Sequence, residues 1–416
     1  MPGCFSIIAS RDRCLRYSFS SSGLKSTTTD LGDGTVMHCW APKNHSPSKP
    51  TLLLIHGIGA NAMWQWHDFV SPLASRFNLY IPDLVFFGDS YSSRPERSEI
   101  FQARCVMALM DAHGVKKMMV TGISYGGFVA YRMAAQFGER IDRLVLCCAG
   151  VCTEEKDMEN GMFQVKSVEE AMNVLLPQKP QHVRDLMKIS FYKPVKNVPS
   201  CFLNDFIEVM CSEHLQERKE LIQALHKDRK LSDLPKINHP TLIIWGEHDL
   251  VFPDVFRTSS REERIDSSTT QGQEVPTLII WGEHDLVFPL ELAHRLKRQI
   301  GESADLVIIK NAGHAINAEK PKEMCKHMKS FLIDPLPTAK HENHSNGRKR
   351  GRQQVRDSGF SNSSGFEIWQ GGAGMTGWQG DDAADGSGRQ RGLGTMRVWF
   401  MMQQRAGQKK PWWRVR

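Results

Sequence analysis

The sequence predicts an α/β fold built on a doubly wound, mostly parallel sheet, and three patterns support this prediction. Apolar runs such as Thr51–Ile55 are continuous rather than alternating, as in parallel strands that are covered on both faces. Strand-like and helix-like segments alternate at short intervals along the chain. A Gly-x-Ser-x-Gly turn at residues 122–126 stands between an apolar run and a helix-compatible stretch.

The elements follow in chain order. Strands are expected at 35–40, after the turn Gly32-Asp33-Gly34, and then at 51–55, 79–81, 118–120, 143–148 and 306–309. Helices are expected at 99–113, where Gly114 favours a C-cap, and at 128–136, 290–300 and 319–331.

Residues 151–236 have a different pattern, with amphipathic stretches at 165–176, 182–190 and 202–226 and no clear strand among them. Insertions at the carboxyl ends of sheet strands tend to form the pocket, so we expect a helical cap here, with extra packing helices as the alternative. The cap would divide the core into residues 31–150 and 237–335. Residues 1–30 are expected to form a polar N-terminal arm, and residues 336–416, which lack sustained periodicity, a disordered or spurious tail.

One strand segment occurs twice. Residues 240–253 read PTLIIWGEHDLVFP, and residues 276–289 are identical. Structural repeats diverge and tile at a regular period, so one verbatim copy indicates a recent duplication or an exon-level error in the chain. The two copies compete for one slot in the sheet, and the copy left out would present an apolar edge that lowers solubility.

Charge and cysteine content limit the partners and the compartment. The net charge is +7, but residues 337–416 hold 14 Lys and Arg against 6 Asp and Glu, which leaves 39 against 40 for residues 1–336. The folded part is therefore near neutral, and we expect no nucleic-acid partner. The ten cysteines form no C-x-x-C pair or metal spacing, so we expect no metal or cofactor, and Cys147-Cys148 is interpreted as apolar filler.

The same features bear on localisation. No run of eighteen apolar residues occurs, so we expect no transmembrane segment, although contact with a membrane surface stays open. This scattered cysteine usage fits a reducing compartment, and we expect the cytoplasm. A chloroplast or another organelle is the alternative, because the first thirty residues are Ser-rich and contain more basic than acidic residues. The oligomeric state is not predicted.

Three residue types point to nucleophilic catalysis. Ser124 stands at the strand–helix turn, an Asp follows a strand in each copy of the duplicated segment (Asp249 and Asp285), and His314 follows the next strand. A serine hydroxyl needs a base within hydrogen-bond reach, and the base needs an acid to fix its tautomer. The chain order Ser, Asp, His is the order of such triads on this kind of sheet. We favour Asp285, because the helix, strand and His after it are uninterrupted, with Asp249 as the alternative acid.

Backbone donors and small residues should complete this site. Acyl transfer needs N–H groups aimed at the oxyanion, and those of Ile58 and Tyr125 are the candidates. His56 and Gly57 are expected to support the loop that carries Ile58. Gly122 and Gly126 flank Ser124, where a Cβ would collide with the neighbouring strand or helix.

The motifs HGIGA, PDLVFFGDS, GISYGG, WGEHDLVFP and NAGHA resemble the α/β-hydrolase superfamily from about residue 30 to residue 335. HGIGANAMWQWHDFV and GDSYSSRPERS, together with a helical cap, are similar to a plant branch of serine hydrolases related to monoacylglycerol lipases and carbon–carbon-bond hydrolases. The resemblance implies an α/β-hydrolase fold and a cofactor-free serine hydrolase, in which Ser124 is the nucleophile, His314 the base and an Asp its orienter. A serine at this turn argues against the dehalogenase and epoxide-hydrolase branches, which use an aspartate.

The leading functional hypothesis is the hydrolysis of carboxylic esters, including monoacylglycerol-like lipids, through an acyl-enzyme. One alternative is a ligand receptor on the same scaffold, which turnover would distinguish, and another is an inactive product of the duplication. Aromatic and apolar side chains that could line an acyl pocket are Trp64, Trp66, Phe86, Phe87, Met162, Phe163 and Phe202.

Overall fold

The computed structural model describes residues 6–237, 242–243, 276–301 and 303–334. Asp249, the predicted tail over 336–416 and most of the first copy of the duplicated segment lie outside the described residues.

Within the described residues the sheet has ten strands, and most of its neighbouring strands are parallel. The strands are β1 (Leu24–Asp30), β2 (Thr35–Pro42), β3 (Thr51–Ile55), β4 (Asn78–Pro82), β5 (Tyr91–Ser92), β6 (Met118–Ile123), β7 (Ile141–Cys147), β8 (Leu242–Ile243), β9 (Thr277–Gly282) and β10 (Ala304–Ile309). Their order is β1-β2-β4-β3-β6-β7-β9-β10-β8, with β5 beside β2. Only the pairings of β2 with β1, β4 and β5 are antiparallel among the described strands. The predicted α/β fold with a mostly parallel sheet is therefore confirmed.

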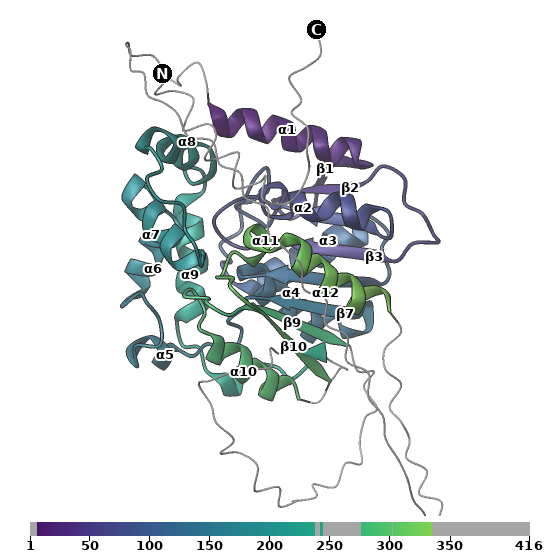
Figure 1. Cartoon of the computed structure of the whole chain (residues 1–416). Helices are drawn as coiled ribbons and strands as arrows, with labels where there is room; N and C mark the ends of the chain where they lie inside the picture. The colour runs from purple at the N-terminus through teal and green to yellow at the C-terminus, as the bar shows by residue number, and fades with distance from the viewer. Residues whose placement is uncertain (1–5, 238–241, 244–275, 302, 335–416) are drawn as a thin grey trace, which may run out of the picture. The chain divides into compact units, whose positions relative to one another are not determined.

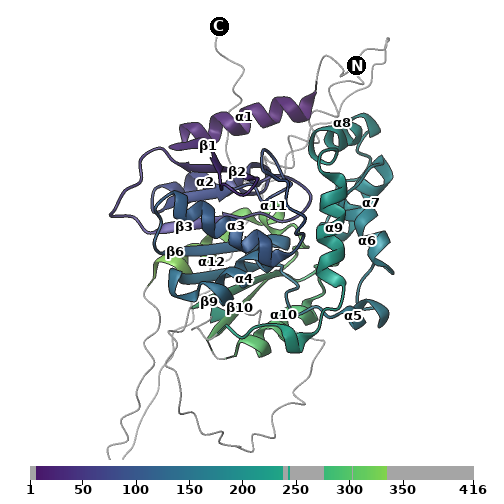
Figure 2. The same ribbon diagram turned by 180° about the vertical axis from the view of Figure 1, so that it is seen from behind.

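Helices cover both faces of this sheet. The helices described in the structure are α1 (Ile7–Ser21), α2 (Ala62–Ala74), α3 (Glu99–Ala112), α4 (Tyr125–Gln136), α5 (Glu155–Glu159), α6 (Val168–Leu175), α7 (Pro180–Ser190), α8 (Ser200–Met210), α9 (Leu215–His226), α10 (Leu290–Ile300), α11 (Ile316–Glu319) and α12 (Pro321–Ile333), with short 3-10 helices at Gly138–Arg140 and Leu231–Asp233. Figure 1 shows α12 in front of the sheet, and the reverse view in Figure 2 shows α3 and α4 there. In the described part of the chain, none of the helices has both the length and the apolar character needed to cross a bilayer.

Helices α5 to α9 gather at one side of the sheet (teal, left in Figure 1) and are called the helical layer below. The amphipathic stretch predicted at 202–226 forms two helices, since α8 ends at Met210 and α9 begins at Leu215. His214 has a left-handed φ of 50°, and Arg218 donates to the carbonyl of Met210 at 2.8 Å. This contact satisfies the end of α8 from a later part of the chain, and no Gly or Pro marks the break in the sequence.

The N-terminal arm contributes regular structure to the fold. Ser6 caps α1 through a bond from the N–H of Ala9, and Phe19 of α1 is fully buried. Strand β1 pairs with β2 from Leu24 to Asp30. A few apolar side chains at helical spacing therefore anchor a segment whose composition is mostly polar.

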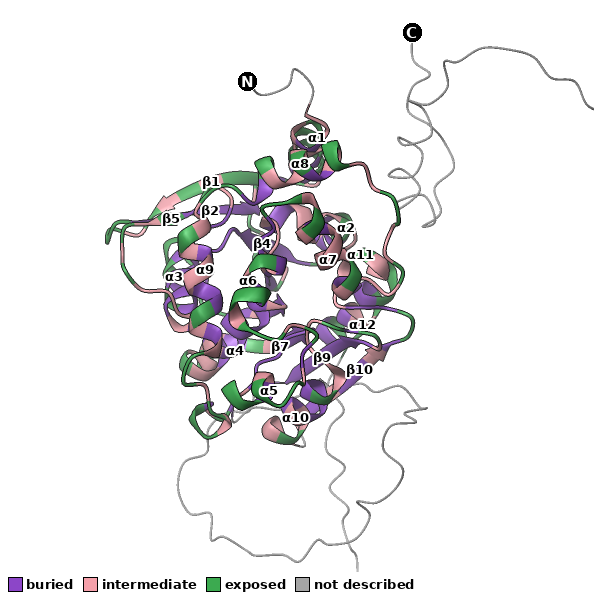
Figure 3. Cartoon of the chain, turned by 90° about the vertical axis from the view of Figure 1, so that its left-hand side faces the viewer, coloured by how far each residue is buried: buried purple, intermediate pink, exposed green. Residues whose placement is uncertain are grey.

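Continuous apolar strands make the core. Every residue of β3, β4 and β9 is buried, as expected for strands covered on both faces. Figure 3 shows buried residues along the strands and exposed residues on outer helices such as α6 and α9. The second copy of the duplicated segment supplies β9, which lies between β7 and β10. Of the first copy, the structure describes only Leu242–Ile243, which run parallel to β9 and β10 as β8.

Three buried titratable groups make stability depend on pH in the same direction. Burial lowers the pKa of His56, so its ring stays neutral in the fold. Burial alone would raise the pKa of Asp83 and Glu99, but His38 beside Asp83, and Arg229 with Arg132 beside Glu99, outweigh it and lower both pKa values. In each case the unfolded chain binds protons at a higher pH than the folded chain does.

We therefore expect the free energy of unfolding to fall as the pH is lowered. The loss should begin below about pH 6.5 through His56 and continue through the carboxylates below about pH 4.5, reaching about 1 kcal/mol or more by about pH 4. Urea unfolding at a series of pH values measures it, and Glu99→Gln should give a shallower dependence at acid pH. A stability that is constant or rises on acidification would contradict this.

Candidate active site

Ser124 occupies a sharp turn between β6 and α4. Its φ of 52° lies in the left-handed region, which a non-glycine residue rarely adopts. The N–H of Ser124 donates to the carbonyl of Cys147 at 2.8 Å, and its own carbonyl accepts from Gly127 at 2.9 Å. These bonds hold the strained turn, which places the hydroxyl at the N-terminal end of α4.

Glycines allow this turn to pack closely. A Cβ at Gly122 would lie 2.2 Å from the carbonyl oxygen of Gly126, and a Cβ at Gly126 would lie 2.4 Å from that of His56. A Cβ at Gly57 would lie 2.8 Å from the Cβ of Ser124. Only glycine fits between the loop after β3 and the turn at Ser124.

The structure brings Ser124, His314 and Asp285 into one hydrogen-bonded row. His314 Nε2 lies 2.9 Å from Ser124 Oγ, and His314 Nδ1 lies 2.8 Å from Asp285 Oδ2. The side chain of Asp285 is fully buried, and its Oδ1 accepts from the N–H groups of Val287 and Phe288, each at 2.9 Å.

This arrangement defines what the row can do chemically. The Asp285 carboxylate can only accept from Nδ1, so Nδ1 carries the proton and Nε2 is left as an acceptor for the Ser124 hydroxyl. A serine, an imidazole and a buried carboxylate in this order can transfer a proton away from the hydroxyl as it attacks.

The loop after β3 is held by two side chains. His56 Nδ1 lies 2.8 Å from the carbonyl oxygen of Gly57, and Nε2 accepts from the N–H of Leu84 at 2.9 Å. Gln65, which the sequence did not suggest, accepts from the N–H of Gly57 at 2.8 Å and donates to its carbonyl at 2.9 Å. These bonds fix the backbone just before Ile58. Tyr125 begins α4, so its N–H has no acceptor within the helix.

Two further residues beside the row escaped the sequence interpretation. Cys148 is fully buried, and its sulfur, a carboxylate oxygen of Asp285 and a ring nitrogen of His314 lie within 4.8 Å of one another. The interpretation of Cys148 as apolar filler is therefore incomplete, because its sulfur also lies close to Asp285 and His314. The ring of Phe288 lies edge-on to His314 at 5.6 Å. Cys148 follows an apolar run, and Phe288 lies in the motif WGEHDLVFP, where the sequence analysis assigned it no role.

A second Ser-His-Asp row links the exposed Ser26 of β1 to the buried residues His38 and Asp83. Ser26 Oγ lies 2.8 Å from His38 Nε2, and His38 Nδ1 lies 2.7 Å from Asp83 Oδ2. Asp83 also accepts from the N–H of Ala62 at 2.8 Å. Ser26 stands in the regular strand β1, whereas Ser124 stands at a strained turn before a helix. The Ser26 row therefore offers a natural control for the Ser124 row.

The side chains that the sequence analysis suggested for an acyl pocket lie in different places: some belong to the core, and one is linked to the Ser124 row. Trp66, Phe86 and Phe87 are buried in the core. Trp64 faces the N-terminal helix, since its Nε1 donates to Asp12 at 3.1 Å. Phe163 alone among these seven side chains is linked to the row by recorded ring contacts: its ring centroid lies 6.5 Å from that of Phe288, which contacts His314.

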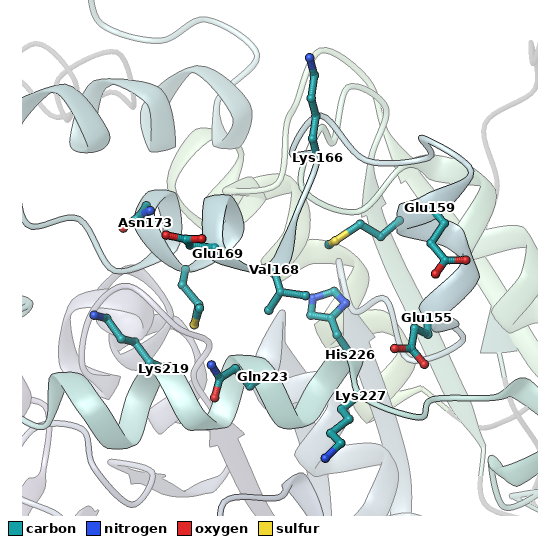
Figure 4. A pocket seen from close by; sticks show the side chains of 12 residues that line it. Glu155, Glu159, Lys166, Val168, Glu169, Asn173, Lys219, Gln223, His226 and Lys227 are labelled. Atoms are coloured by element: carbon teal, nitrogen blue, oxygen red, sulfur yellow. The ribbon is translucent and has the colours of Figure 1, made fainter.

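A pocket of about 830 Å³ opens within the helical layer, between α5, α6 and α9 (Figure 4). Its lining combines Met158, Val168 and Met172 with charged residues such as Glu169 and Lys219. His226 also lines it, and the His226 ring lies 6.4 Å from that of Phe163. Ring contacts thus run from His226 through Phe163 and Phe288 to His314.

Comparison with known families decides the affiliation of this chain. A family model described as alpha/beta hydrolase fold matches residues 50–263, more than half of the 416 residues. The chain belongs to the alpha/beta hydrolase fold family. A second model, described as TAP-like protein, matches residues 254–343. The first match contains the copy at 240–253 and the second contains the copy at 276–289, so each copy falls in a different match.

Relatives of this alpha/beta hydrolase include a lipase. An uncharacterized protein of Mycobacterium tuberculosis is 34% identical over 128 residues, which are 31% of this chain and only 37% of that protein. A monoacylglycerol lipase of Xenopus laevis is 25% identical over 321 residues, 75% of this chain and 83% of the lipase. The solved structure of 2-hydroxy-6-oxo-6-phenylhexa-2,4-dienoate hydrolase from Rhodococcus sp. strain RHA1 has a TM-score of 0.54 and 19% identity, covering 74% of this chain and 98% of that one. The last likeness concerns the fold alone.

Proposed function

We propose that this alpha/beta hydrolase is a serine hydrolase that cleaves carboxylic esters through an acyl-enzyme. The observation that carries the proposal is the row from Ser124 Oγ through the His314 ring to the buried Asp285 carboxylate. The match to a monoacylglycerol lipase over three quarters of the chain supports an ester substrate.

Each residue then has a role in two successive steps. Ser124 Oγ attacks the ester carbonyl while His314 Nε2 takes its proton, and the N–H groups of Ile58 and Tyr125 bind the oxyanion. His314 returns the proton to the leaving alcohol. Water then attacks the acyl-enzyme with His314 as base again, which releases the acid and restores Ser124. Asp285 holds the Nδ1–H tautomer throughout.

The helical layer would act as the cap of this site and favour an ester with an apolar acyl chain. The pocket in this layer is lined by Met158, Val168 and Met172 together with charged and polar side chains, and ring contacts connect Phe163, Phe288 and His314. A lining that mixes apolar and charged side chains suits an amphiphile such as a monoacylglycerol. The narrower kinship with the plant branch and with carbon–carbon-bond hydrolases stays a prediction from the sequence motifs.

Steady-state turnover tests the proposal. The purified chain is expected to hydrolyse p-nitrophenyl butyrate and monooleoylglycerol over many turnovers, with a rapid first release of nitrophenol if deacylation is slow. A receptor on the same scaffold would bind its ligand and stop after about one equivalent of product. A folded protein without turnover of either ester, or of other acyl esters, would contradict the proposal.

A further inference from the structure

The helical layer touches the loop that carries His314, through the segment that follows α7. This segment, residues 190–193, begins at Ser190, whose carbonyl accepts from the N–H of Ala315 at 2.8 Å. Gly313 packs directly on it: a Cβ there would lie 2.7 Å from the carbonyl oxygen of Ser190 and 2.9 Å from the nitrogen of Tyr192. The backbones on both sides of His314 are therefore in contact with the 190–193 segment.

Glu319, at the end of α11, joins these two pieces of chain. Its Oε2 accepts from the N–H of Gly313 at 2.7 Å and from the N–H of Tyr192 at 3.2 Å, and its Oε1 accepts from the N–H of Lys193 at 3.4 Å. A carboxylate that accepts several backbone N–H groups makes stronger bonds than a neutral acceptor would. One side chain thus fixes the residue before His314 relative to the helical layer.

The same segment also contacts the loop that carries Asp285. The Tyr192 ring stacks on the His284 ring, with centroids 4.4 Å apart and planes 15° from parallel. His284 immediately precedes Asp285, and its N–H donates to the carbonyl of Ala312 at 2.9 Å. The 190–193 segment therefore bears on the loops of both partners of Ser124.

We propose that Glu319 is a positioning residue that couples the seating of the 190–193 segment to the placement of His314. Glu319 does not touch Ser124 and acts only through the backbone of the His314 loop. When the helical layer is displaced, the bridge to Gly313 loosens and His314 Nε2 loses its alignment with Ser124 Oγ. The functional part of this inference rests on the proposed serine hydrolase mechanism, in which small displacements of the base cost rate.

Kinetics of two single variants and their combination test the coupling. Glu319→Gln and Tyr192→Ala are each expected to lower kcat for p-nitrophenyl butyrate by about 10-fold to 100-fold, with KM within about threefold, because a charge-assisted bond or a stacked contact near His314 is lost. The double variant should lose less than the product of the two effects, since both act through one segment. Multiplicative losses, or unchanged kcat in Glu319→Gln, would overturn the proposal.

Matched controls separate this effect from a general loss of stability. Glu323→Gln changes an exposed carboxylate on α12, and Tyr17→Ala removes a ring on α1 that is 76% exposed. Both should keep the kcat of the unaltered protein. If Glu323→Gln lowers kcat as much as Glu319→Gln does, the bridge has no special role.

Hydrogen exchange tests the coupling without any activity. In the Ser124→Ala background, adding Tyr192→Ala should speed exchange of the peptide spanning residues 311–316 by about tenfold, while the peptide spanning 51–56 in β3 stays unchanged. Unchanged exchange at 311–316 would overturn the coupling even if the protein is an active hydrolase. Faster exchange in a protein without ester turnover would keep the coupling and reject the proposed function instead.

Discussion

Replacement of Ser124 by alanine is expected to lower kcat for ester hydrolysis by about 10⁶-fold. In the proposed mechanism the hydroxyl forms the acyl-enzyme, whereas His314, held by Asp285 at 2.8 Å, only transfers protons. The Ala side chain fits a turn already shaped around Cβ, so the thermal unfolding transition should stay close to that of the unaltered protein. Steady-state kinetics with p-nitrophenyl butyrate measure the loss.

Ser26→Ala is the matched control for this variant. It makes the same chemical change in a row with similar distances, 2.8 Å from Ser26 Oγ to His38 and 2.7 Å from His38 to Asp83. Ser26 lies in a regular strand rather than at a turn before a helix, and its variant should retain full kcat. Loss of turnover in Ser26→Ala, with turnover preserved in Ser124→Ala, would contradict the proposal and show that Ser26 is the nucleophile.

Asp285→Asn is expected to lower kcat by about 10⁴-fold with little change in KM. The two N–H groups of Val287 and Phe288 point at Oδ1, so the single oxygen of an asparagine would take that place and turn its NH₂ toward His314. His314 Nδ1 must then accept, its proton moves to Nε2, and Nε2 can no longer receive the Ser124 proton. A pH–rate profile recorded alongside kcat would show partial recovery at high pH if a hydroxide ion substitutes for the base.

Asp249→Asn is the control that the duplication itself provides. Both aspartates sit in the same fourteen-residue sequence; Asp285 is hydrogen bonded to His314, and Asp249 lies outside the described residues. Asp249→Asn should leave kcat unchanged. If Asp249→Asn instead abolishes turnover while Asp285→Asn does not, the first copy of the segment supplies the acid.

The fold class could be predicted from the sequence, because strands and helices of this fold leave local patterns of apolar residues. Continuous apolar runs predicted strands that the structure buries on both faces, as in β3 and β9. The break between α8 and α9 was missed because Arg218, eight residues on, satisfies the end of α8 through a tertiary contact. The regular structure of the N-terminal arm rests on a few apolar side chains such as Phe19 in a polar context.

The candidate site could be predicted only in part from the sequence, because tertiary contacts place some of its residues. Ser124, His56 and His314 stand in motifs whose spacing reflects the turn chemistry. Gln65 lies in the quoted stretch HGIGANAMWQWHDFV but had no predicted role, and Cys148 and Glu319 lie in no quoted motif. Only the folded geometry brings these three side chains to the site. The two copies of the duplicated segment are identical in sequence, so the sequence favours Asp285 only because an uninterrupted helix, strand and His314 follow it.

Identification of the serine modified by a fluorophosphonate tests the central claim most directly. The folded, unaltered protein is treated with the probe, digested and examined by mass spectrometry of its peptides. We predict a single phosphonyl adduct on Ser124, because among the serines that the structure describes Ser124 alone combines a hydrogen-bonded imidazole with a helix N-terminus. An adduct on Ser26 or another serine, or no adduct on a folded protein, would contradict an activated nucleophile at this turn.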